Sequence, residues 1–427
     1  MTTTTRYLVL TTLRWLPVGF TIPISILLPV SRGLSLSEVG LAFAAQGLLV
    51  LCLELPTGGL SDSWGRRPVL LLGSAFGIAA STMLVVADSF PTFVLVWALQ
   101  GVFRALDSGP LEAWYVDATL AANPDAALEK GLSSGGAALS IAVASGALIS
   151  GALVALDPPD GLNPLTLPAV IALGLVIVST IGVATLMTEQ RPRDTRLGVR
   201  DSIRAVPAIV RQGVGLLRGN RVLLALVSVE LFWGFGMVSF ENLTSVRLAE
   251  LTDGPNAAAA LMGPVTSGAW VTSALGAATI VLLSGRIGVA SAAIILRLLQ
   301  AGAVVAMGLV GGPAGLVVAF LAAYCVHGAS NPLHMTLLHR EVTGEHRSTV
   351  ISVNSMAAMP ASALGVIVLT ALADRSSIAV SIVVGGVVLA LAAPLYLPAR
   401  RREQHLQLAS QLDTTDVSTS EAQARKP

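Results

Sequence analysis

Residues 58–68 read Gly58-Gly59-Leu60-Ser61-Asp62-Ser63-Trp64-Gly65-Arg66-Arg67-Pro68, and no other stretch of the chain is as informative. This stretch forms a short polar break between the apolar runs 38–60 and 68–87. Glycines let two helices approach closely, and an aspartate and an arginine four residues apart, such as Asp62 and Arg66, can pair on one helical face. A plain basic turn would account for the arginines but not for Asp62 between its glycines.

The composition indicates a chain that is largely covered by lipid. Of its 427 residues, 54% are hydrophobic and 12% are charged, and the mean hydropathy is +0.76. A soluble globular protein carries about 25% charged residues because its surface must face water. The net charge of +1 lacks the basic excess typical of nucleic-acid-binding proteins. The two cysteines, Cys52 and Cys325, have no metal-binding spacing, so we predict neither a metal site nor a cofactor.

Hydropathy predicts twelve membrane-spanning helices, because each apolar run is near the roughly 20 residues that cross a ~30 Å hydrocarbon layer. The expected spans are 8–30, 38–60, 68–87, 90–116, 132–156, 166–187, 222–246, 258–284, 288–310, 313–338, 348–372 and 376–398. The run 8–30 is too long for the core of a signal peptide, and no cleavage site of small residues follows it. We therefore expect it to remain as the first span.

Positive charges are distributed unequally between the two sides of the predicted membrane. With an even number of spans, both termini lie on one side. Of the arginines and lysines outside the spans, only Arg32, Arg247 and Arg375 fall on the other side. The positive-inside rule therefore predicts that both termini are cytoplasmic.

Two short matches indicate that the chain consists of duplicated halves. Ser108-Gly109-Pro110-Leu111-Glu112 in the fourth span matches Ser330-Asn331-Pro332-Leu333-His334 in the tenth. Gly65-Arg66 matches Gly285-Arg286 at nearly the same offset. Paired halves with a binding site between them are common among transporters.

The predicted organisation is a six-helix bundle over 1–187, a cytoplasmic linker over 188–221, a second bundle over 222–398 and a cytoplasmic tail over 399–427. In the linker, apolar residues alternate with arginines at helical spacing, which predicts an amphipathic helix along the cytoplasmic headgroups. A solvated linker is the alternative, because Pro207 and several glycines interrupt the pattern.

Residues 58–70 resemble the signature loop between spans two and three of the major facilitator superfamily, G-x-L-x-D-x-x-G-R-R/K, and they occupy the corresponding place. Three further segments resemble bacterial exporters of that superfamily: Arg32-Gly33-Leu34-Ser35, Glu54-Leu55-Pro56-Thr57-Gly58 and Ser108-Gly109-Pro110-Leu111-Glu112-Ala113-Trp114. The resemblance implies an all-α membrane protein with twelve transmembrane helices in two six-helix pseudo-repeats. These repeats would surround a central cavity that opens alternately to each side of a bacterial inner or plasma membrane.

The resemblance also implies a gate at the cytoplasmic end of the first half. In the family, the arginine at the position of Arg66 links the loop aspartate, here Asp62, to an acidic residue that ends the fourth span. Asp117 occupies that position. The expected gating motif comprises Gly58, Asp62, Gly65, Arg66, Arg67 and Asp117.

Ionisable residues inside the predicted spans are candidates for binding protons or substrate. A charge at mid-bilayer costs ~2.5–3.5 kcal/mol even on a lenient scale, so it usually faces a cavity or a partner. The candidates are Glu54, Arg104, Asp107, Glu112, Glu230, His327 and His334. Glu241 and Arg297 also lie within spans, but we assign them no role.

Structural alternatives stay open for the candidates of the first half. Arg104 and Asp107 are three residues apart and can neutralise each other, so a structural pair is as well supported as a functional one. Glu54 and Glu112 could exchange protons, because burial away from water favours the neutral carboxyl group. Their deprotonated forms would attract a cationic substrate. They could instead brace the helices beside the neighbouring prolines.

The candidates of the second half form two groups. Glu230 shares one face of the seventh span with Met237 and lies beside Trp233, a pattern that favours a cavity wall over ordinary helix packing. His327 and His334 are seven residues apart on one face of the tenth span. Histidine titrates near neutral pH, so both could carry protons, or they could serve as hydrogen-bonded packing residues.

Several catalytic patterns are missing from the sequence. The nucleotide-binding pattern G-x-x-x-x-G-K-[ST] is missing, since neither Lys130 nor Lys426 fits it, and H-E-x-x-H is also missing. Residues 131–135 match G-x-S-x-G formally, but they lie in an apolar helical run without the strand that this elbow requires. We therefore expect a protein that is not an enzyme and is not driven by ATP.

These observations together predict a monomeric secondary active transporter whose partners are a small-molecule substrate, protons and the lipid bilayer. The resemblance favours an antiporter that carries out proton-coupled efflux of a small amphipathic compound, such as a drug or secondary metabolite. Two alternatives stay open. One is proton-coupled import of a nutrient or osmolyte, and the other is a sensor on the same fold that binds without transporting.

Overall fold

The computed structural model describes residues 1–156, 163–188, 215–342 and 347–405, together with residues 204, 208, 211, 213 and 407. Within these ranges, the side-chain surroundings of residues 55, 58, 59, 62, 63, 281–283 and 347–349 are not described. All regular structure in the described part of the chain is helical, which confirms the predicted all-α fold.

The first half contains one helical run for each expected span. Its elements are α1 (Thr3–Thr21), η1 (Ile22–Ile24), α2 (Leu27–Ser31), α3 (Leu36–Trp64), α4 (Arg66–Val86), α5 (Phe90–Asp107), α6 (Pro110–Ala122), α7 (Glu129–Ala155) and α8 (Thr166–Leu186). The first span thus consists of α1, η1 and α2, and the fourth consists of α5 and α6.

The second half repeats this arrangement. Its elements are α10 (Arg221–Glu241), α11 (Leu243–Leu251), α12 (Pro255–Ile287), α13 (Val289–Leu309), α14 (Pro313–Arg340), α15 (Arg347–Arg375), α16 (Ile378–Ala390) and η3 (Ala393–Tyr396), and the chain stays helical from there to His405. Over both halves, eleven helical runs in the described residues are long and apolar enough to cross a membrane. The expected fourth span, α5 with α6, is the one of the twelve expected spans that is not among these eleven.

The fourth and tenth spans differ in spite of their matching sequences. The fourth is broken between α5 and α6, where Gly109 has a φ of 93° and Pro110 begins the new helix. A positive φ is easily adopted only by glycine. The tenth span has Asn331 at the corresponding position and continues as the single helix α14 through Pro332.

The structure corrects one of the two sequence matches. A single residue, Gly65, joins α3 to α4 with φ 96° and ψ 157°. Gly288 joins α12 to α13 with φ 84° and ψ 155°. Gly288 is therefore the structural counterpart of Gly65, and the match of Gly65 to Gly285 is wrong, because Gly285 lies inside the last turn of α12.

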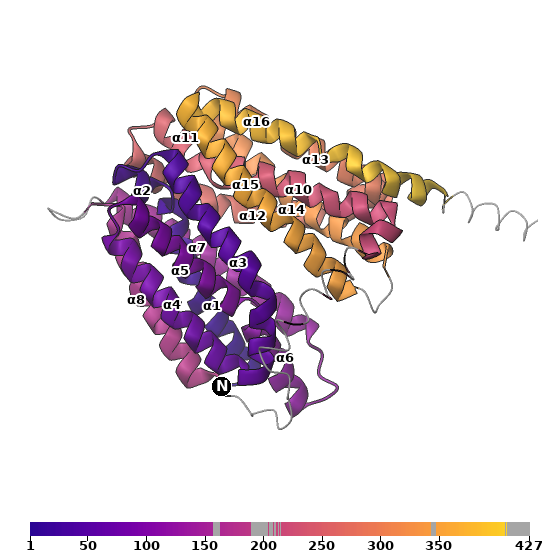
Figure 1. The fold of residues 1–427 in the computed structure, drawn as a ribbon, viewed down its shortest axis with the longest axis horizontal. Helices are drawn as coiled ribbons and strands as arrows, with labels where there is room; N and C mark the ends of the chain where they lie inside the picture. Colours follow the sequence, from indigo (N-terminus) through magenta and orange to yellow (C-terminus); the bar gives the residue numbers. More distant parts are fainter. Residues whose placement is uncertain are drawn as a thin grey trace, which may run out of the picture.

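The two halves meet at one end and diverge at the other. In Figure 1, helices α1–α8 and α10–α16 approach each other near α2 and α11 and separate toward the end that carries the N-terminus and α6. The contacts between the halves are made mainly by α3 with α15 and by α7 with α12. We call the end where they meet the closed end and the opposite one the open end.

The distribution of the buried apolar residues matches this shape. One cluster contains residues of both halves, including Val39 and Val154 with Ala258 and Leu369, and lies toward the closed end. The other two clusters of the described residues are each confined to one half. The common core therefore holds the halves together at the closed end only.

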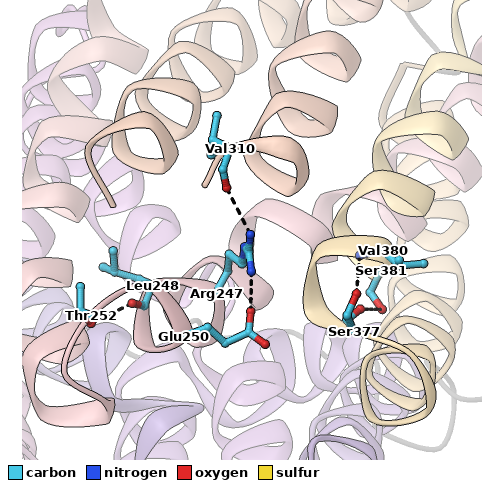
Figure 2. Close-up of polar contacts among 8 residues, drawn as sticks. All are labelled: Arg247, Leu248, Glu250, Thr252, Val310, Ser377, Val380 and Ser381. Atoms are coloured by element: carbon cyan, nitrogen blue, oxygen red, sulfur yellow. Dashed lines mark hydrogen bonds and ion pairs between the residues drawn. The ribbon is translucent and has the colours of Figure 1, made fainter. Parts of the chain in front are cut away.

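Two arginines stabilise equivalent places at the closed end. The guanidinium of Arg32, just after α2, donates to the backbone carbonyls of Leu84 and Val85, each at 2.9 Å, and of Ala87, at the C-terminal end of α4. Arg247 of α11 donates to the carbonyl of Val310 at 3.2 Å, at the end of α13, and to Glu250 at 2.8 Å (Figure 2). Positive charge is favourable at a helix C-terminus. This explains why two of the three arginines on the sparsely charged side occur there.

The linker over 188–221 falls largely outside the described residues. Its described residues are 188, 204, 208, 211, 213 and 215–221, and all of them except 188 and 220 are helical. The amphipathic helix remains a prediction. Residues 408–427 of the tail also lie outside the described part.

Candidate functional site

A cavity with two lobes lies between the halves. The second-half lobe has a volume of about 510 Å³ and is lined mainly by α10, α14 and α15 of the second half and by α3 of the first. The first-half lobe has a volume of about 450 Å³ and is lined mainly by α1, α3, α5, α6 and α7. Val50, Arg104 and Met359 line both lobes, so the two spaces adjoin at these residues.

Four sequence candidates line the first-half lobe. Glu54 comes from α3, Arg104 and Asp107 from the last turns of α5, and Glu112 from the first turn of α6. The break between α5 and α6 also places Ser108 and Gly109 in the lining. The motif shared by the fourth and tenth spans therefore contributes to the cavity wall.

The structure assigns Asp107 a different partner from the one its spacing suggested. Its carboxylate pairs with the guanidinium of Arg14, from the buried face of α1, and not with that of Arg104. Arg14 was absent from the sequence candidates. An arginine inside an apolar span needs a partner, and this was the one signal that could have identified it.

Arg104 is exposed to the cavity. It makes no hydrogen bond or ion pair with the residues that the structure describes. The acid whose charge acts on it is Glu54, across the interface of α3 and α5. Glu54 and Glu112 likewise make no side-chain hydrogen bond within the described part of the chain.

In the second-half lobe, His334 is the centre of a buried network. Its Nε2 lies 3.1 Å from Oε1 of Glu230 and 3.1 Å from Oδ1 of Asn354, and its Nδ1 lies 3.0 Å from the hydroxyl of Tyr396. Because two oxygens face Nε2, this nitrogen carries a proton and donates to them. The network joins α10, α14, α15 and η3, and it brings the candidates Glu230 and His334 together.

Arg297, to which the sequence analysis gave no role, belongs to the same lobe. Its side chain is only 3% exposed, lines the cavity and donates to the side-chain oxygen of Gln300 at 2.8 Å. Its positive charge acts on Glu230. A buried acid, a buried arginine and a histidine therefore adjoin one cavity wall. Spacing along the chain could not reveal this, because the residues lie on different helices.

Aromatic and thioether groups cover another part of this lobe. The rings of Trp233 and His327 stack with their centroids 5.7 Å apart and an angle of 9° between planes. Met237, on the same helix as Trp233, also lines the lobe. Glu241 does not line either lobe and accepts a hydrogen bond of 2.6 Å from the hydroxyl of Tyr324.

The residues of the expected gating motif lie at the open end. Arg66, at the start of α4, forms an ion pair of 2.7 Å with Asp117 of α6. Arg67 donates to the backbone carbonyl of Ala184 on α8. Gly65 supplies the turn between α3 and α4. Gly58 and Asp62 lie in α3, but their surroundings are outside the described part, so the contacts of Asp62 remain a prediction.

Neither lobe offers a metal site among the residues that the structure describes. No group of three or more histidine, cysteine, aspartate or glutamate side chains in that part could hold an ion. The cavity wall instead combines carboxyl and imidazole groups, which are able to bind protons, with the guanidinium groups of arginines. Such a site can bind polar and charged groups of a small molecule.

Comparison with known proteins identifies the relatives of this chain. A protein-family model described as Major Facilitator Superfamily matches residues 7–326. The inner membrane transport protein YajR of Escherichia coli (strain K12) is 36% identical over 70 residues, which cover 16% of this chain and 15% of that protein. This match therefore spans a small part of the relative's length.

Two solved structures have similar folds. The nucleoside transporter NupG has a TM-score of 0.76 at 12% sequence identity, covering 93% of this chain and 99% of that chain. A bacterial homolog of the human lysosomal transporter Spinster, in an inward-facing and occupied conformation, has a TM-score of 0.71 at 15% identity, covering 93% and 96%. At these identities the likeness concerns the fold alone.

Proposed function

The chain belongs to the major facilitator superfamily, and from this premise we propose that it is a proton-coupled secondary active transporter that moves a small amphipathic compound by alternating access. The observation that carries the proposal is the two-lobed cavity between two halves that meet at one end and diverge at the other. Ligand sites of this size, a few hundred Å³, take drug-sized molecules.

The orientation follows from the charges along the chain. The open end carries the N-terminus and the turn at Gly65 with Arg66 and Arg67, and the charges along the chain favour a cytoplasmic N-terminus. We therefore place the open end at the cytoplasm of a bacterial inner membrane. The conformation described here is then inward-open. The outward-open form requires that the contacts between α3 and α15 and between α7 and α12 separate at the closed end, and that Arg66, Asp117 and Asp62 brace the cytoplasmic end.

Proton coupling is supported by the acids in both lobes. Glu230 is held by His334, and Glu54 and Glu112 line the first-half lobe. A carboxyl group inside a membrane is stable in its neutral form and becomes charged when it meets a partner or water. Each of these acids could therefore take up a proton on one side of the membrane and release it on the other.

Efflux is the direction that we favour, because residues 32–35, 54–58 and 108–114 resemble bacterial exporters. Import by proton symport is the second candidate. The charge of Glu54 acting on Arg104 supports it, since a proton on Glu54 would remove a negative charge that competes with an anionic substrate for Arg104. Direction is thus a separate question from transport itself.

The test uses purified protein in vesicles with an imposed pH gradient. Growth of cells with and without the protein on a panel of toxic compounds first selects a compound. We expect the vesicles to accumulate or expel that compound against its gradient only while the pH gradient lasts. Binding without any flux would support the sensor alternative and overturn the proposal. Accumulation together with protons, rather than against them, would assign import.

A further inference from the structure

Arg104 lies where the two lobes of the cavity join. It is one of three residues that line both lobes, and the other two, Val50 and Met359, are apolar. A molecule that extends from one lobe into the other must therefore pass its guanidinium group. No other charged residue has this position among those described.

The other arginines of the cavity already have partners. Arg14 pairs with Asp107, and Arg297 donates to Gln300 and lies near Glu230. Arg104 makes no such contact with any described residue, and its side chain is exposed to the cavity. Its five N–H donors are therefore available to a ligand.

The unpaired acids of the first-half lobe do not need a partner of opposite charge in the way that Arg104 does. Glu54 and Glu112 can bind a proton and become neutral, whereas a guanidinium group stays charged under all conditions that a protein meets. A fixed charge within the membrane is costly unless an anion or water compensates it. The permanent demand of this cavity is thus for negative charge.

We infer that the transported compound carries an acidic group, such as a carboxylate, that binds to Arg104 at the junction of the lobes. This inference names the substrate class of the proposed transporter, and it therefore rests on the proposed function. The arginine fork suits a planar anion with two oxygens. The body of the compound would extend toward Trp233 and Met237 in the second-half lobe. The acids suggested a cationic substrate from the sequence, but the structure adds a fixed positive charge at the junction.

A competing view is that Glu54 is the partner of Arg104 through water or in another conformation. The two views predict opposite effects of one variant. If Arg104 serves the substrate, Glu54→Gln removes a competing negative charge and strengthens the binding of acids. If Arg104 serves Glu54, the same variant leaves an uncompensated cation and reduces folding stability and binding together, as Arg104→Gln would.

The experiment measures thermal stabilisation of the purified full-length protein, since a ligand that binds the folded state raises the melting temperature. The probes are matched sets of aryl and alkyl compounds at millimolar concentration, each body carrying a carboxylate, a carboxamide or an ammonium group. We expect stabilisation by carboxylates over their amides and amines. Arg104→Gln should lower the affinity for acids about tenfold or more, Arg104→Lys should lower it less, and Glu54→Gln should raise it.

Several outcomes would overturn the inference: stabilisation by amides or amines as strong as by acids, acid binding that survives Arg104→Gln, loss of acid binding in Glu54→Gln, or no stabilisation by any acid. Size-exclusion elution and the melting temperature without ligand verify that each variant is folded. Vesicle flux separates the two proposals. Acid binding without flux would sink the transport proposal alone, and flux confined to neutral compounds would sink this inference alone.

Discussion

Asp374, near the C-terminal end of α15, accepts a hydrogen bond of 2.7 Å from the backbone N–H of Ser37, and this bond crosses from the second half to the first. The other oxygen of the carboxylate accepts a bond of 3.2 Å from the N–H of Leu36. Both donors belong to the first turn of α3, where backbone N–H groups have no partner within the helix and negative charge is favoured. Asp374 of the second half thus caps α3 of the first half. This contact can exist only in the form of the protein in which the two halves meet at this end.

Replacing Asp374 by alanine should shift the protein toward the form that is open at this end. Loss of a helix cap costs about 0.5–2 kcal/mol, which corresponds to roughly a 2- to 30-fold change in the ratio of the two forms. The measurement is labelling from outside the cell of a single cysteine at Ser362, which lines the second-half lobe, in a background without Cys52 and Cys325. Labelling should be faster in the variant.

Asp253 provides the matched control for this experiment. It is an exposed aspartate at the same end, between α11 and α12, and no contact of its side chain is present in the described part. Asp253→Ala should leave the labelling rate unchanged. Equal rates in Asp374→Ala and the unmodified protein would contradict a role for the cap.

The ion pair of Arg66 and Asp117 should affect transport more than stability. Asp117 is 67% exposed, and pairs at such exposure contribute at most about 1 kcal/mol to folding. We expect Asp117→Asn and Asp62→Asn to keep the melting temperature but to reduce flux strongly, because the cytoplasmic end then closes poorly. Wild-type flux in Asp62→Asn would remove Asp62 from the gate.

Glu230→Gln should separate uphill from downhill transport. The glutamine preserves the size of the side chain and can still accept the hydrogen bond from His334, but it cannot carry a proton in exchange. Proton-driven accumulation should be lost while exchange down the substrate gradient continues. The rates of proton-driven accumulation and of downhill exchange are both measured in vesicles for Glu230→Gln, Glu54→Gln and Glu112→Gln. A variant that lowers both rates through lost protein marks a bracing residue. If none of the three separates the rates, His327 and His334 become the next candidates.

The close approach of α7 and α12 predicts a packing effect at the closed end. A Cβ atom on Gly263 would lie 2.8 Å from the carbonyl oxygen of Ala147 and 2.9 Å from Cα of Gly151, so a larger residue must push the helices apart. Gly263→Val should lower the melting temperature, since overpacking costs about 1–3 kcal/mol. Gly302→Ala is the control, because nothing lies within 4 Å of the added atom. Equal melting temperatures in both variants would contradict the contact.

The orientation can be tested with a single cysteine at Arg200, in the arginine-rich linker. In a background without Cys52 and Cys325, this cysteine should resist a membrane-impermeant thiol reagent in intact cells and react after lysis. The reason is the strong excess of arginines on that side. Rapid labelling in intact cells would reverse the assignment of the open end to the cytoplasm.

The sequence by itself determined the helical membrane fold, its spans and the polar break over 58–68, because hydropathy depends on residues adjacent along the chain. It also placed Asp117 within reach of Arg66 through the resemblance to a family. It identified Glu54, Glu112, Glu230, His327 and His334 as unusual, since an ionisable group within a membrane span is costly whichever way it faces.

Only the tertiary structure decided which of these groups meet. Asp107 pairs with Arg14 and not with Arg104, and His334 joins Glu230, Asn354 and Tyr396 from three other elements. The tertiary structure alone also brings Asp374 of α15 to the first turn of α3. Spacing along one helix restricts which side chains share a face, but the rotation and tilt of neighbouring helices determine what that face contacts. These depend on packing summed over the whole bundle.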